Sequence, residues 1–311
     1  MTHTKPSKAL LPLFEKRHSA KRPGKGLMTD IITLLGVKGG PAIRPGSNMP
    51  TATLVEMGGQ RILVDAGLGV SRSLCAQGVA LTALDAIVIT HLHSDHYLEL
   101  GPLLHTAWTA GLNRTVPVYG PPRLSHYWQA FLTSMEDDIR LRIEDEGRPD
   151  LAGLVDLHPL ASGDVITLGD VRMDALENHH PPVVPSFALR FDDGAKRVVL
   201  SGDTAPIPAM VNFARGADLL LHEAMLVEGV DALLAKTPNG DDRLKTHILR
   251  SHTPADQAGR IAAEAGVGML ALNHFVPDGL PGFPAAAWEA AVRRTWQGML
   301  IVGEDGMQIV L

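Results

Sequence analysis

The feature that most constrains this chain is a dense cluster of ionisable side chains directly after a short apolar segment. The cluster is Thr90-His91-Leu92-His93-Ser94-Asp95-His96, and the segment Ala86–Thr90 before it has the composition of a buried strand. A loop at the carboxyl end of a strand is free of sheet hydrogen bonding, so its side chains can converge. Imidazole nitrogens and carboxylates are ligands that zinc and similar metals prefer. The sequence therefore predicts a metal site at this strand end.

Short apolar segments alternate with helical segments from about Asp30 to the end of the chain. In the first half, the pattern predicts strands at Ile31–Leu35, Ala52–Glu56, Arg61–Val64 and Ala86–Thr90, and helices at Val70–Gln77, Glu99–Ala110 and Leu124–Met135. In the second half, it predicts strands at Val165–Leu168, Val171–Ala175, Ser186–Phe191, Arg197–Ser201, Leu219–His222, Met269–Leu272, Met299–Val302 and Met307–Leu311, and helices at Pro254–Ala265 and Ala285–Thr295. This order predicts two sheets packed face to face with helices outside, which is a four-layer αββα sandwich in the α/β class.

Composition excludes several classes of protein. With 45% hydrophobic and 20% charged residues, the chain of 311 residues has the composition of a globular protein. Cys75 is its single cysteine, which rules out an intrachain disulfide and a zinc cluster built on thiolates. No run of 18 apolar residues is present, so we expect no membrane contact. The N-terminus does not have the pattern of a signal peptide, and a cytoplasmic location is expected.

The net charge of −6 is unevenly distributed along the chain. Residues 1–25 contain Glu15 and seven basic residues, which are Lys5, Lys8, Lys16, Arg17, Lys21, Arg22 and Lys25. We expect residues 1–28 to form a basic, flexible arm and residues 29–311 to form a single domain. Such an arm could contact nucleic acid or a partner subunit, but an acidic body argues against a large nucleic-acid surface.

Five later segments place polar residues next to predicted strands or helices. They are Asn178-His179-His180-Pro181-Pro182, Val198-Val199-Leu200-Ser201-Gly202-Asp203-Thr204, Leu221-His222-Glu223-Ala224, Ser251-His252-Thr253-Pro254 and Leu272-Asn273-His274-Phe275. Together with the HxHxDH motif, their order resembles the metallo-β-lactamase superfamily, in its ribonuclease Z-like and arylsulfatase-like branch. The resemblance extends from about residue 31 to the C-terminus.

This resemblance implies a metallo-β-lactamase fold with two bound metal ions per chain, zinc first, with Mn²⁺ or Fe²⁺ as alternatives. One ion would be held by His91, His93 and His180, and the other by Asp95, His96 and His274, with Asp203 bridging the two. Adjacent side chains point in different directions, so only one of His179 and His180 should reach a metal. The His-Pro-Pro-Val run in similar sequences favours His180.

The resemblance also implies hydrolysis, in which a hydroxide bridging the two metals attacks the substrate. Asp95 could accept a proton as well as bind metal, and His252 or His222 could protonate the leaving group. Glu223 and His222 could instead only orient neighbouring ligands, and both interpretations stay open.

A small-molecule substrate is the expectation from the sequence: an ester, sulfate ester, lactone, phosphodiester or activated aryl halide. A ribonuclease Z-like phosphodiesterase acting on RNA is the alternative. Only 23 positions separate His180 from Asp203, where ribonuclease Z proteins carry a long arm that clamps tRNA, and the acidic body counts against nucleic acid as a partner. A homodimer is expected from the habit of the family and from the apolar content of Leu98–Trp108 and Leu124–Phe131. A metal-binding scaffold without activity is disfavoured because all seven ligands are present.

Overall fold

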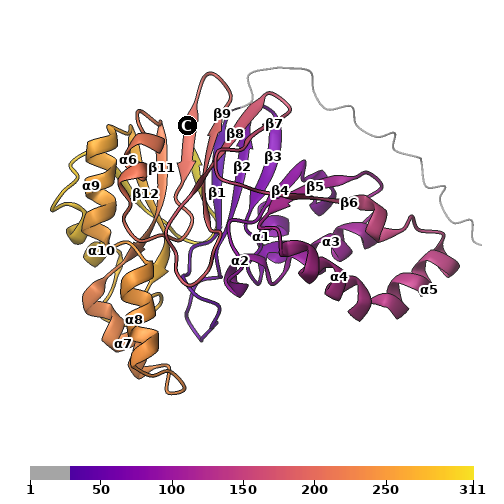
Figure 1. Ribbon diagram of the computed structural model, residues 1–311, viewed down its shortest axis with the longest axis horizontal. Helices are drawn as coiled ribbons and strands as arrows, with labels where there is room; N and C mark the ends of the chain where they lie inside the picture. The colour runs from indigo at the N-terminus through magenta and orange to yellow at the C-terminus, as the bar shows by residue number, and fades with distance from the viewer. Residues whose placement is uncertain (1–28) are drawn as a thin grey trace, which may run out of the picture.

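The computed structural model describes residues 29–311, so the predicted basic arm lies outside the described residues. Within this part of the chain, two seven-stranded sheets pack against each other and helices cover their outer faces (Figure 1). Helices α1, α3 and α4 lie on one side of the pair of sheets, and α6, α9 and α10 lie on the other (Figure 1). The four-layer αββα sandwich expected from the sequence is confirmed.

The first sheet has the strand order β14-β1-β2-β3-β4-β5-β6. Its strands are β1 (Ile31–Gly36), β2 (Ala52–Met57), β3 (Gln60–Val64), β4 (Ala86–Val88), β5 (Val116–Gly120), β6 (Val155–Pro159) and β14 (Met307–Val310). Strands β3 to β6 run parallel to one another, whereas β14, β1, β2 and β3 pair antiparallel.

The second sheet has the order β13-β12-β11-β10-β9-β8-β7. Its strands are β7 (Val165–Leu168), β8 (Val171–Glu177), β9 (Phe187–Asp192), β10 (Arg197–Leu200), β11 (Leu219–Met225), β12 (Met269–Val276) and β13 (Met299–Val302). Strands β10 to β13 run parallel. Each sheet therefore has a parallel block, and ligands bind such sheets beyond the carboxyl ends of the parallel strands.

The helices fall into three groups. The first lies on the outer side of the first sheet and comprises α1 (Val70–Ala76), α2 (Ser94–Tyr97), α3 (Leu100–Thr109) and α4 (Leu124–Ser134), after which α5 (Glu136–Glu146) extends away from the sheets (Figure 1). The second covers the second sheet and comprises α6 (Pro208–Phe213), α9 (Ala255–Ala265) and α10 (Ala285–Val292). The third is a hairpin of α7 (Val230–Ala235) and α8 (Asp242–Ser251), which lie side by side below the second sheet (Figure 1).

Two large hydrophobic clusters hold these layers together. The larger one fills the space between the sheets and extends under α9 and α10, with Phe187, Phe191 and Trp288 among its members. The other lies between the first sheet and its helices, and it buries both Trp108 and Trp128. Both tryptophans are therefore core residues.

Strands β5 and β6 are not among those that the sequence predicted. Pro117 stands inside β5, although proline removes a donor from a strand and is rare in the middle of a sheet. Strand β6 has no fully buried residue and forms the edge of its sheet. Strand β6 alternates apolar and polar residues only over Val155-Asp156-Leu157-His158, and β5 contains a proline, so both signals are short and the neighbouring strands determine the structure.

The densely charged segment Met135–Asp150 has no apolar stripe, a pattern that predicts an exposed helical excursion or a lid. It contains helix α5, in which only Ile139 is buried, and ion pairs one turn apart join Arg142 to Asp138 and Glu146. None of its residues lines the cavity described below, so the segment is an exposed helix and not a lid over the site.

No helix in the described part of the chain is long and apolar enough to cross a membrane.

Candidate metal centre

The seven predicted ligands meet where the carboxyl ends of the parallel strands from the two sheets face each other. His91 and His93 follow β4, and Asp95 and His96 lie in α2 directly after them. From the second sheet, His180 follows β8, Asp203 follows β10, and His274 lies near the end of β12. Gly202 precedes Asp203 with φ +57°, where a side chain would collide with the carbonyl of Phe187. Glycine at that position therefore permits the turn that aims Asp203 at the centre.

His274 reaches the site through an irregularity in β12. Glu223 of β11 pairs with Asn273, while the next residue, Ala224, pairs with Phe275, so His274 is the extra residue of a bulge. Its φ of +45° is uncommon for a residue with a side chain. Bulges re-aim side chains, and this one turns the His274 ring towards Asp203 and Asp95.

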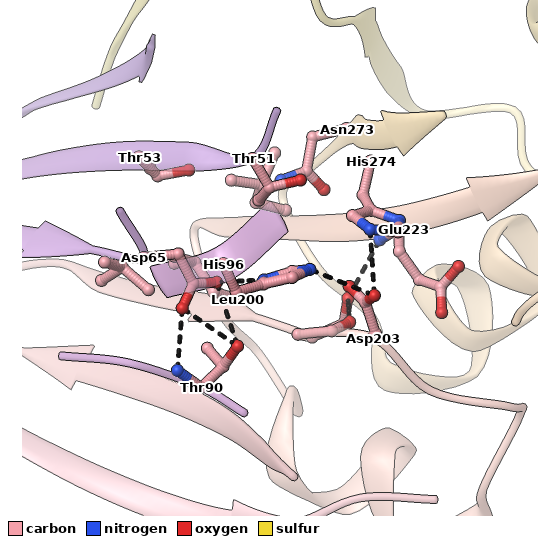
Figure 2. Close-up of a pocket in the computed structure, with 14 residues that line it drawn as sticks. Thr51, Thr53, Asp65, Thr90, His96, Leu200, Asp203, Glu223, Asn273 and His274 are labelled. Carbon is pink, nitrogen blue, oxygen red and sulfur yellow. Dashed lines mark hydrogen bonds and ion pairs between the residues drawn. The ribbon is translucent and has the colours of Figure 1, made fainter. Parts of the chain in front are cut away.

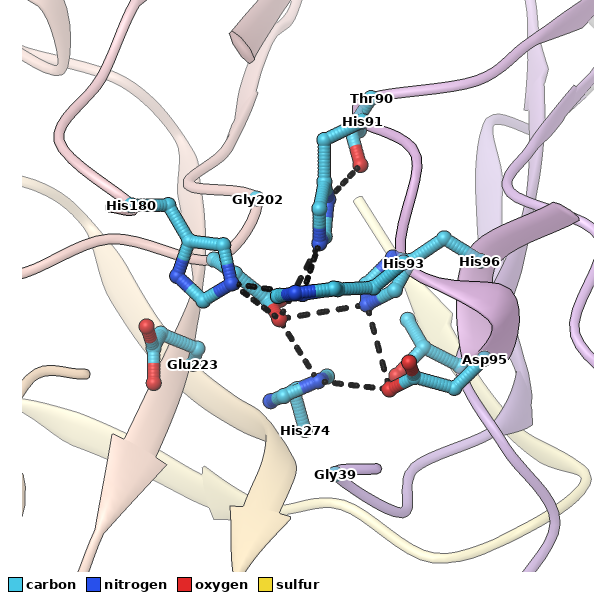
Figure 3. A network of polar contacts seen from close by, with 12 residues as sticks. Gly39, Thr90, His91, His93, Asp95, His96, His180, Gly202, Glu223 and His274 are labelled. Carbon is cyan, nitrogen blue, oxygen red and sulfur yellow. Dashed lines mark hydrogen bonds and ion pairs between the residues drawn. The ribbon is translucent and has the colours of Figure 1, made fainter. Parts of the chain in front are cut away.

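The first cluster consists of His91, His93, His180 and Asp203. The His93 Nδ1 atom lies 3.1 Å from His91 Nε2 and 2.9 Å from His180 Nε2, so three ring nitrogens converge (Figure 3). The Asp203 Oδ2 atom lies 3.7 Å from His91 Nε2 and 3.8 Å from His180 Nε2. Three nitrogens and a carboxylate around one point form a donor set for a cation.

The second cluster consists of Asp95, His96, His274 and the same Asp203. The Asp203 Oδ2 atom lies 3.2 Å from His96 Nε2 and 2.9 Å from His274 Nε2. The Asp95 Oδ2 atom lies 3.5 Å and 3.4 Å from the same two nitrogens. Asp203 thus lies between the clusters, in the place where a bridging carboxylate would hold two cations together.

Neighbouring groups fix the orientation of the histidine rings. His96 Nδ1 lies 2.7 Å from Asp65 Oδ2, and that carboxylate also accepts hydrogen bonds from the backbone N–H and the hydroxyl of Thr90 (Figure 2). His180 Nδ1 donates to the backbone carbonyl of Ser251 at 2.9 Å. Partners of this kind direct the other ring nitrogen towards a metal.

Asp65 is a functional candidate that the sequence reasoning missed. It follows β3 with φ +64°, a left-handed conformation that is rare outside glycine, asparagine and aspartate. The available signal was an aspartate at a strand end in the run Leu63-Val64-Asp65-Ala66-Gly67, which has the same form as the strand end at Asp203.

The protonation of the first cluster suits metal binding. Burial and the neighbouring His180 lower the pKa of His93 to about 4, and burial and His96 lower the pKa of His91 well below its usual value. Burial also lowers the pKa of His180. These rings are neutral near pH 7, and neutral imidazoles have the lone pairs that a metal needs.

The second cluster has the opposite electrostatics. Burial opposes the charged form of His274, but Asp203 and Asp95 outweigh it and raise the pKa of His274 to about 10. The pKa of His96 is likewise raised, by Asp203, Asp65 and Asp95 against burial. His96 Nε2 is fully buried and has no hydrogen-bond partner among the described residues, although it faces two carboxylates. The donor set and this buried nitrogen fit a bound metal ion.

The structure separates His179 from His180. His180 is buried with its ring in the first cluster, while His179 is exposed and, within residues 29–311, its hydrogen bonds are those of its backbone with Thr204 and Ala205. This placement agrees with the choice of His180 as the ligand.

The predicted proton-transfer residues are only partly brought together. His252 Nδ1 lies 2.9 Å from Glu223 Oε2, and Glu223 Oε1 accepts the backbone N–H of Thr204 at 2.6 Å. His222 lies apart: it is buried, its Nδ1 donates to the carbonyl of Glu223, and it lines no part of the cavity beside the clusters. Because successive strand residues point to opposite faces, the geometry favours Glu223 over His222 for a role at the site.

A cavity of about 320 Å³ opens beside both clusters. His93, Asp95, Asp203, His252 and His274 form its inner wall. The loop 38–44 and the α7–α8 hairpin form the rest, including Lys38, Arg44 and His247. His247 lies in α8 and lines the cavity, although no sequence motif points to it. The sequence predicts a pocket rim at Gly39–Pro50, Pro181–Pro185 and Lys236–Lys245. The first and third segments contribute, through residues such as Arg44 and Leu244, whereas no residue of Pro181–Pro185 lines the cavity.

Comparisons with known proteins agree with this architecture. The family model described as Anti-Pycsar protein Apyc1 matches residues 31–273. The chain is 34% identical over 277 residues to a ribonuclease Z of Mycobacterium avium, and the match covers 88% of this chain and 95% of that protein. A ribonuclease Z of Mycobacterium marinum is 33% identical, with 88% and 96% covered.

Solved structures share the fold. The metallo-beta-lactamase fold protein YhfI from Bacillus subtilis has a TM-score of 0.67 and 23% identity, and the match covers 91% of this chain and 100% of that one. Human tRNase Z, short form, has a TM-score of 0.62 and 20% identity, with 90% and 98% covered.

Fold and site together define a class: this is a metal-dependent hydrolase of the metallo-β-lactamase fold. Within that class, the sequence identity to the mycobacterial proteins decides the family. The chain belongs to the ribonuclease Z-like family of the metallo-β-lactamase superfamily.

Two expectations about partners are wrong: a small-molecule substrate, and the statement that nucleic acid is unlikely. The relatives are named ribonuclease Z, and the alignment covers 95% of the Mycobacterium avium protein, which leaves little room for an arm that this chain lacks. The short spacing from His180 to Asp203 therefore does not exclude RNA. Net charge is a sum over the whole chain, whereas binding depends on the local field, and here Lys38 and Arg44 line the cavity.

Proposed function

We propose that this protein is a phosphodiesterase that cleaves RNA at the metal centre between its two sheets. The observation that carries the proposal is the match to ribonuclease Z proteins over nearly their whole length, combined with both histidine–aspartate clusters in one buried site. When bound, two metal ions would polarise the phosphodiester and lower the pKa of a water molecule.

The chain's own residues have separate tasks in this proposal. Asp203 holds the clusters together, and the backbone N–H of Gly40 donates to Asp95 Oδ2 at 2.8 Å, which fixes the Asp95 carboxylate. Glu223 holds the His252 ring through Nδ1, so the opposite nitrogen, Nε2, can give a proton to the departing ribose oxygen.

The cavity mouth supplies positive charge for a phosphodiester. Lys38 Nζ donates to the carbonyls of Gly39 and Gly40, and Arg44 donates to the Thr237 hydroxyl and the Ala42 carbonyl. Among the residues that the structure describes, no carboxylate forms an ion pair with either. Arg44, which is half-buried, can therefore attract a phosphate, and phosphate contacts contribute much of the affinity for nucleic acids. Lys38 is buried and burial lowers its pKa, so its main contribution is to brace the Gly39–Gly40 backbone.

Incubation of the metal-loaded protein with a structured RNA that carries a single-stranded 3′ extension tests the proposal. We expect cleavage by the wild type, loss of cleavage after chelation, and recovery on adding Zn²⁺ or Mn²⁺. An RNA left intact by a protein that contains its metals and hydrolyses bis(p-nitrophenyl) phosphate would overturn it.

Three finer proposals accompany it. Zinc is the proposed metal, since imidazole and carboxylate ligands suit it, and elemental analysis of the purified protein should find close to two zinc equivalents. The cytoplasmic location stays a prediction, and fractionation of the cells that produce the protein would test it. The homodimer also stays a prediction, and sedimentation at micromolar concentration would decide it.

A further inference from the structure

Lys38 is a buried lysine that lies next to the metal clusters. It follows β1, and only 4% of its surface is exposed. Its Nζ atom donates to the carbonyl oxygens of Gly39 and Gly40, at 2.7 Å each. Burying an amino group costs free energy unless hydrogen bonds satisfy it, and here the side chain bonds to the two residues that follow it. Lys38 therefore folds its own loop into a compact turn.

The backbone N–H groups of the two glycines bind two different elements. The N–H of Gly39 donates to the carbonyl of Phe275 in β12 at 3.1 Å. The N–H of Gly40 donates to Oδ2 of Asp95, a predicted metal ligand, at 2.8 Å. Since Lys38 holds both carbonyls, all four backbone hydrogen-bonding groups of the two glycines have a partner. Their conformation is therefore fixed on both sides.

The same two glycines pack against the second cluster. A Cβ atom on Gly39 would lie 2.7 Å from the side chain of Val276 and 3.0 Å from Cε1 of His274, so only glycine fits there (Figure 3). Gly40 has φ +80°, a left-handed conformation that residues with a side chain rarely adopt. One short stretch of backbone thus touches the His274 ring and, through the next N–H, the Asp95 carboxylate.

These contacts distinguish the second cluster from the first. Asp95 and His274 both belong to the second cluster. Within residues 29–311, no hydrogen bond joins the segment 38–40 to the three histidines of the first cluster. A change in this segment should therefore affect the second metal position and spare the first.

We propose that Lys38 is a positioning residue for the metal ion of the second cluster, and that it acts through the backbone it folds. Because Nζ holds the carbonyls of Gly39 and Gly40, the Gly40 N–H stays aimed at Asp95 Oδ2, the oxygen that faces the ring nitrogens of the cluster. Loss of a group that orients a ligand typically weakens metal affinity about 10–100-fold. This role goes beyond the proposed function, since it concerns metal binding whatever the substrate is.

Two single-metal backgrounds test the role of Lys38. His91→Ala removes a ligand of the first cluster only, and His274→Ala removes a ligand of the second only. Lys38→Met, which keeps the length of the side chain and removes its donor, is added to each background. Competition with a chelator then measures Zn²⁺ affinity. We expect Lys38→Met to weaken Zn²⁺ binding about 10–100-fold in the His91→Ala background and less than about twofold in the His274→Ala background.

Three further variants complete the experiment. Lys38→Arg keeps a donor for the two carbonyls, so it should bind Zn²⁺ more tightly than Lys38→Met in the His91→Ala background. Gly39→Ala pushes the backbone away from the His274 ring while Lys38 is intact, and it should weaken the same metal position. Lys236→Met is the matched control, because Lys236 is exposed and lines no part of the cavity, and it should change neither affinity.

A loss confined to the His91→Ala background supports the proposal. An unchanged affinity in that background, or equal losses in both backgrounds, would overturn it. If Lys38→Met does not fold, Lys38→Arg and Gly39→Ala are judged by the same criterion. None of these measurements uses RNA, so a metal-loaded protein that cleaves no RNA would overturn the proposed function and leave the role of Lys38 intact.

Discussion

The two ligand clusters share Asp203, yet their charges are balanced in different ways. In the first cluster, three imidazoles have lowered or strongly lowered pKa values and surround a single carboxylate. In the second, the pKa values of His96 and His274 are raised, and each ring faces Asp95 and Asp203. The second cluster pairs rings of raised pKa with two carboxylates, whereas the first gathers three neutral rings around one carboxylate, which is a donor set that suits a cation. Removing a ligand from the first cluster should therefore weaken metal binding, and removing a ligand from the second should also lower the stability of the metal-free protein.

Asp203 belongs to both clusters, so its removal should have the largest effect. Asp203→Ala leaves two cations without their shared anion, and we expect loss of at least one metal equivalent and a fall in turnover of about a thousandfold or more. Metal analysis and RNA cleavage measure this, with the exposed Asp156→Ala as the control for losing an acid elsewhere. Retention of two metals and full rate would show that other groups hold the metals together.

A comparison of His96→Ala with His180→Ala separates the clusters. Removing His96 takes away the one ring that faces the buried carboxylates of Asp65, Asp95 and Asp203 together, and breaking a buried ion-pair network costs about 3–5 kcal/mol of stability. Removing His180 loses a hydrogen bond to a carbonyl, which costs about 1–3 kcal/mol. Urea unfolding of the metal-free proteins should rank them in this order, and equal midpoints would contradict the distinction.

The His180→Ala variant also tests which of the neighbouring histidines, His179 or His180, is the metal ligand. His180→Ala should lose metal and activity together, while His179→Ala should retain its metal, because the His179 side chain is exposed outside the clusters. The reverse result would place the ligand one residue earlier.

Asp65→Asn tests how far metal binding by the second cluster depends on the contact between Asp65 and His96. The amide keeps the size of the side chain but removes the charge that orients His96 through Nδ1. Loss of such a partner typically weakens metal affinity about 10–100-fold. Competition with a chelator measures the change, and an unchanged affinity would mean that backbone packing alone orients the His96 ring.

The smallest effect is expected from a region outside both clusters. Deletion of residues 1–25 removes seven basic residues and one acidic residue, so KM for RNA should rise several-fold at low salt and match the full chain at high salt. Metal content should not change. A deletion that leaves KM unchanged at every salt concentration would exclude the arm from RNA binding.

The sequence by itself determined the parts of the site that depend on local spacing. Three histidines and an aspartate within six residues after β4 must lie close together at that strand end, and the strand ends at His180, Asp203 and His274 indicated where the other ligands lie. The αββα order could also be read from the chain, because apolar strands and amphipathic helices follow local periodicity. Even the difference between His222 and Glu223 follows from strand alternation, although the sequence reasoning left it open.

Only the tertiary structure decided features that depend on residues distant in sequence. The bulge that turns His274 inward arises from its register with β11, and Asp65 reaches His96 across 31 positions. Strand β5 exists because β4 and β6 pair with it on both sides despite Pro117. Apolar residues of α8 line the cavity because that helix packs on β12, and nothing in its amphipathic pattern indicates which surface it will cover. Strand pairing and side-chain packing between distant segments select these arrangements. The local sequence does not show which distant segment will be the partner.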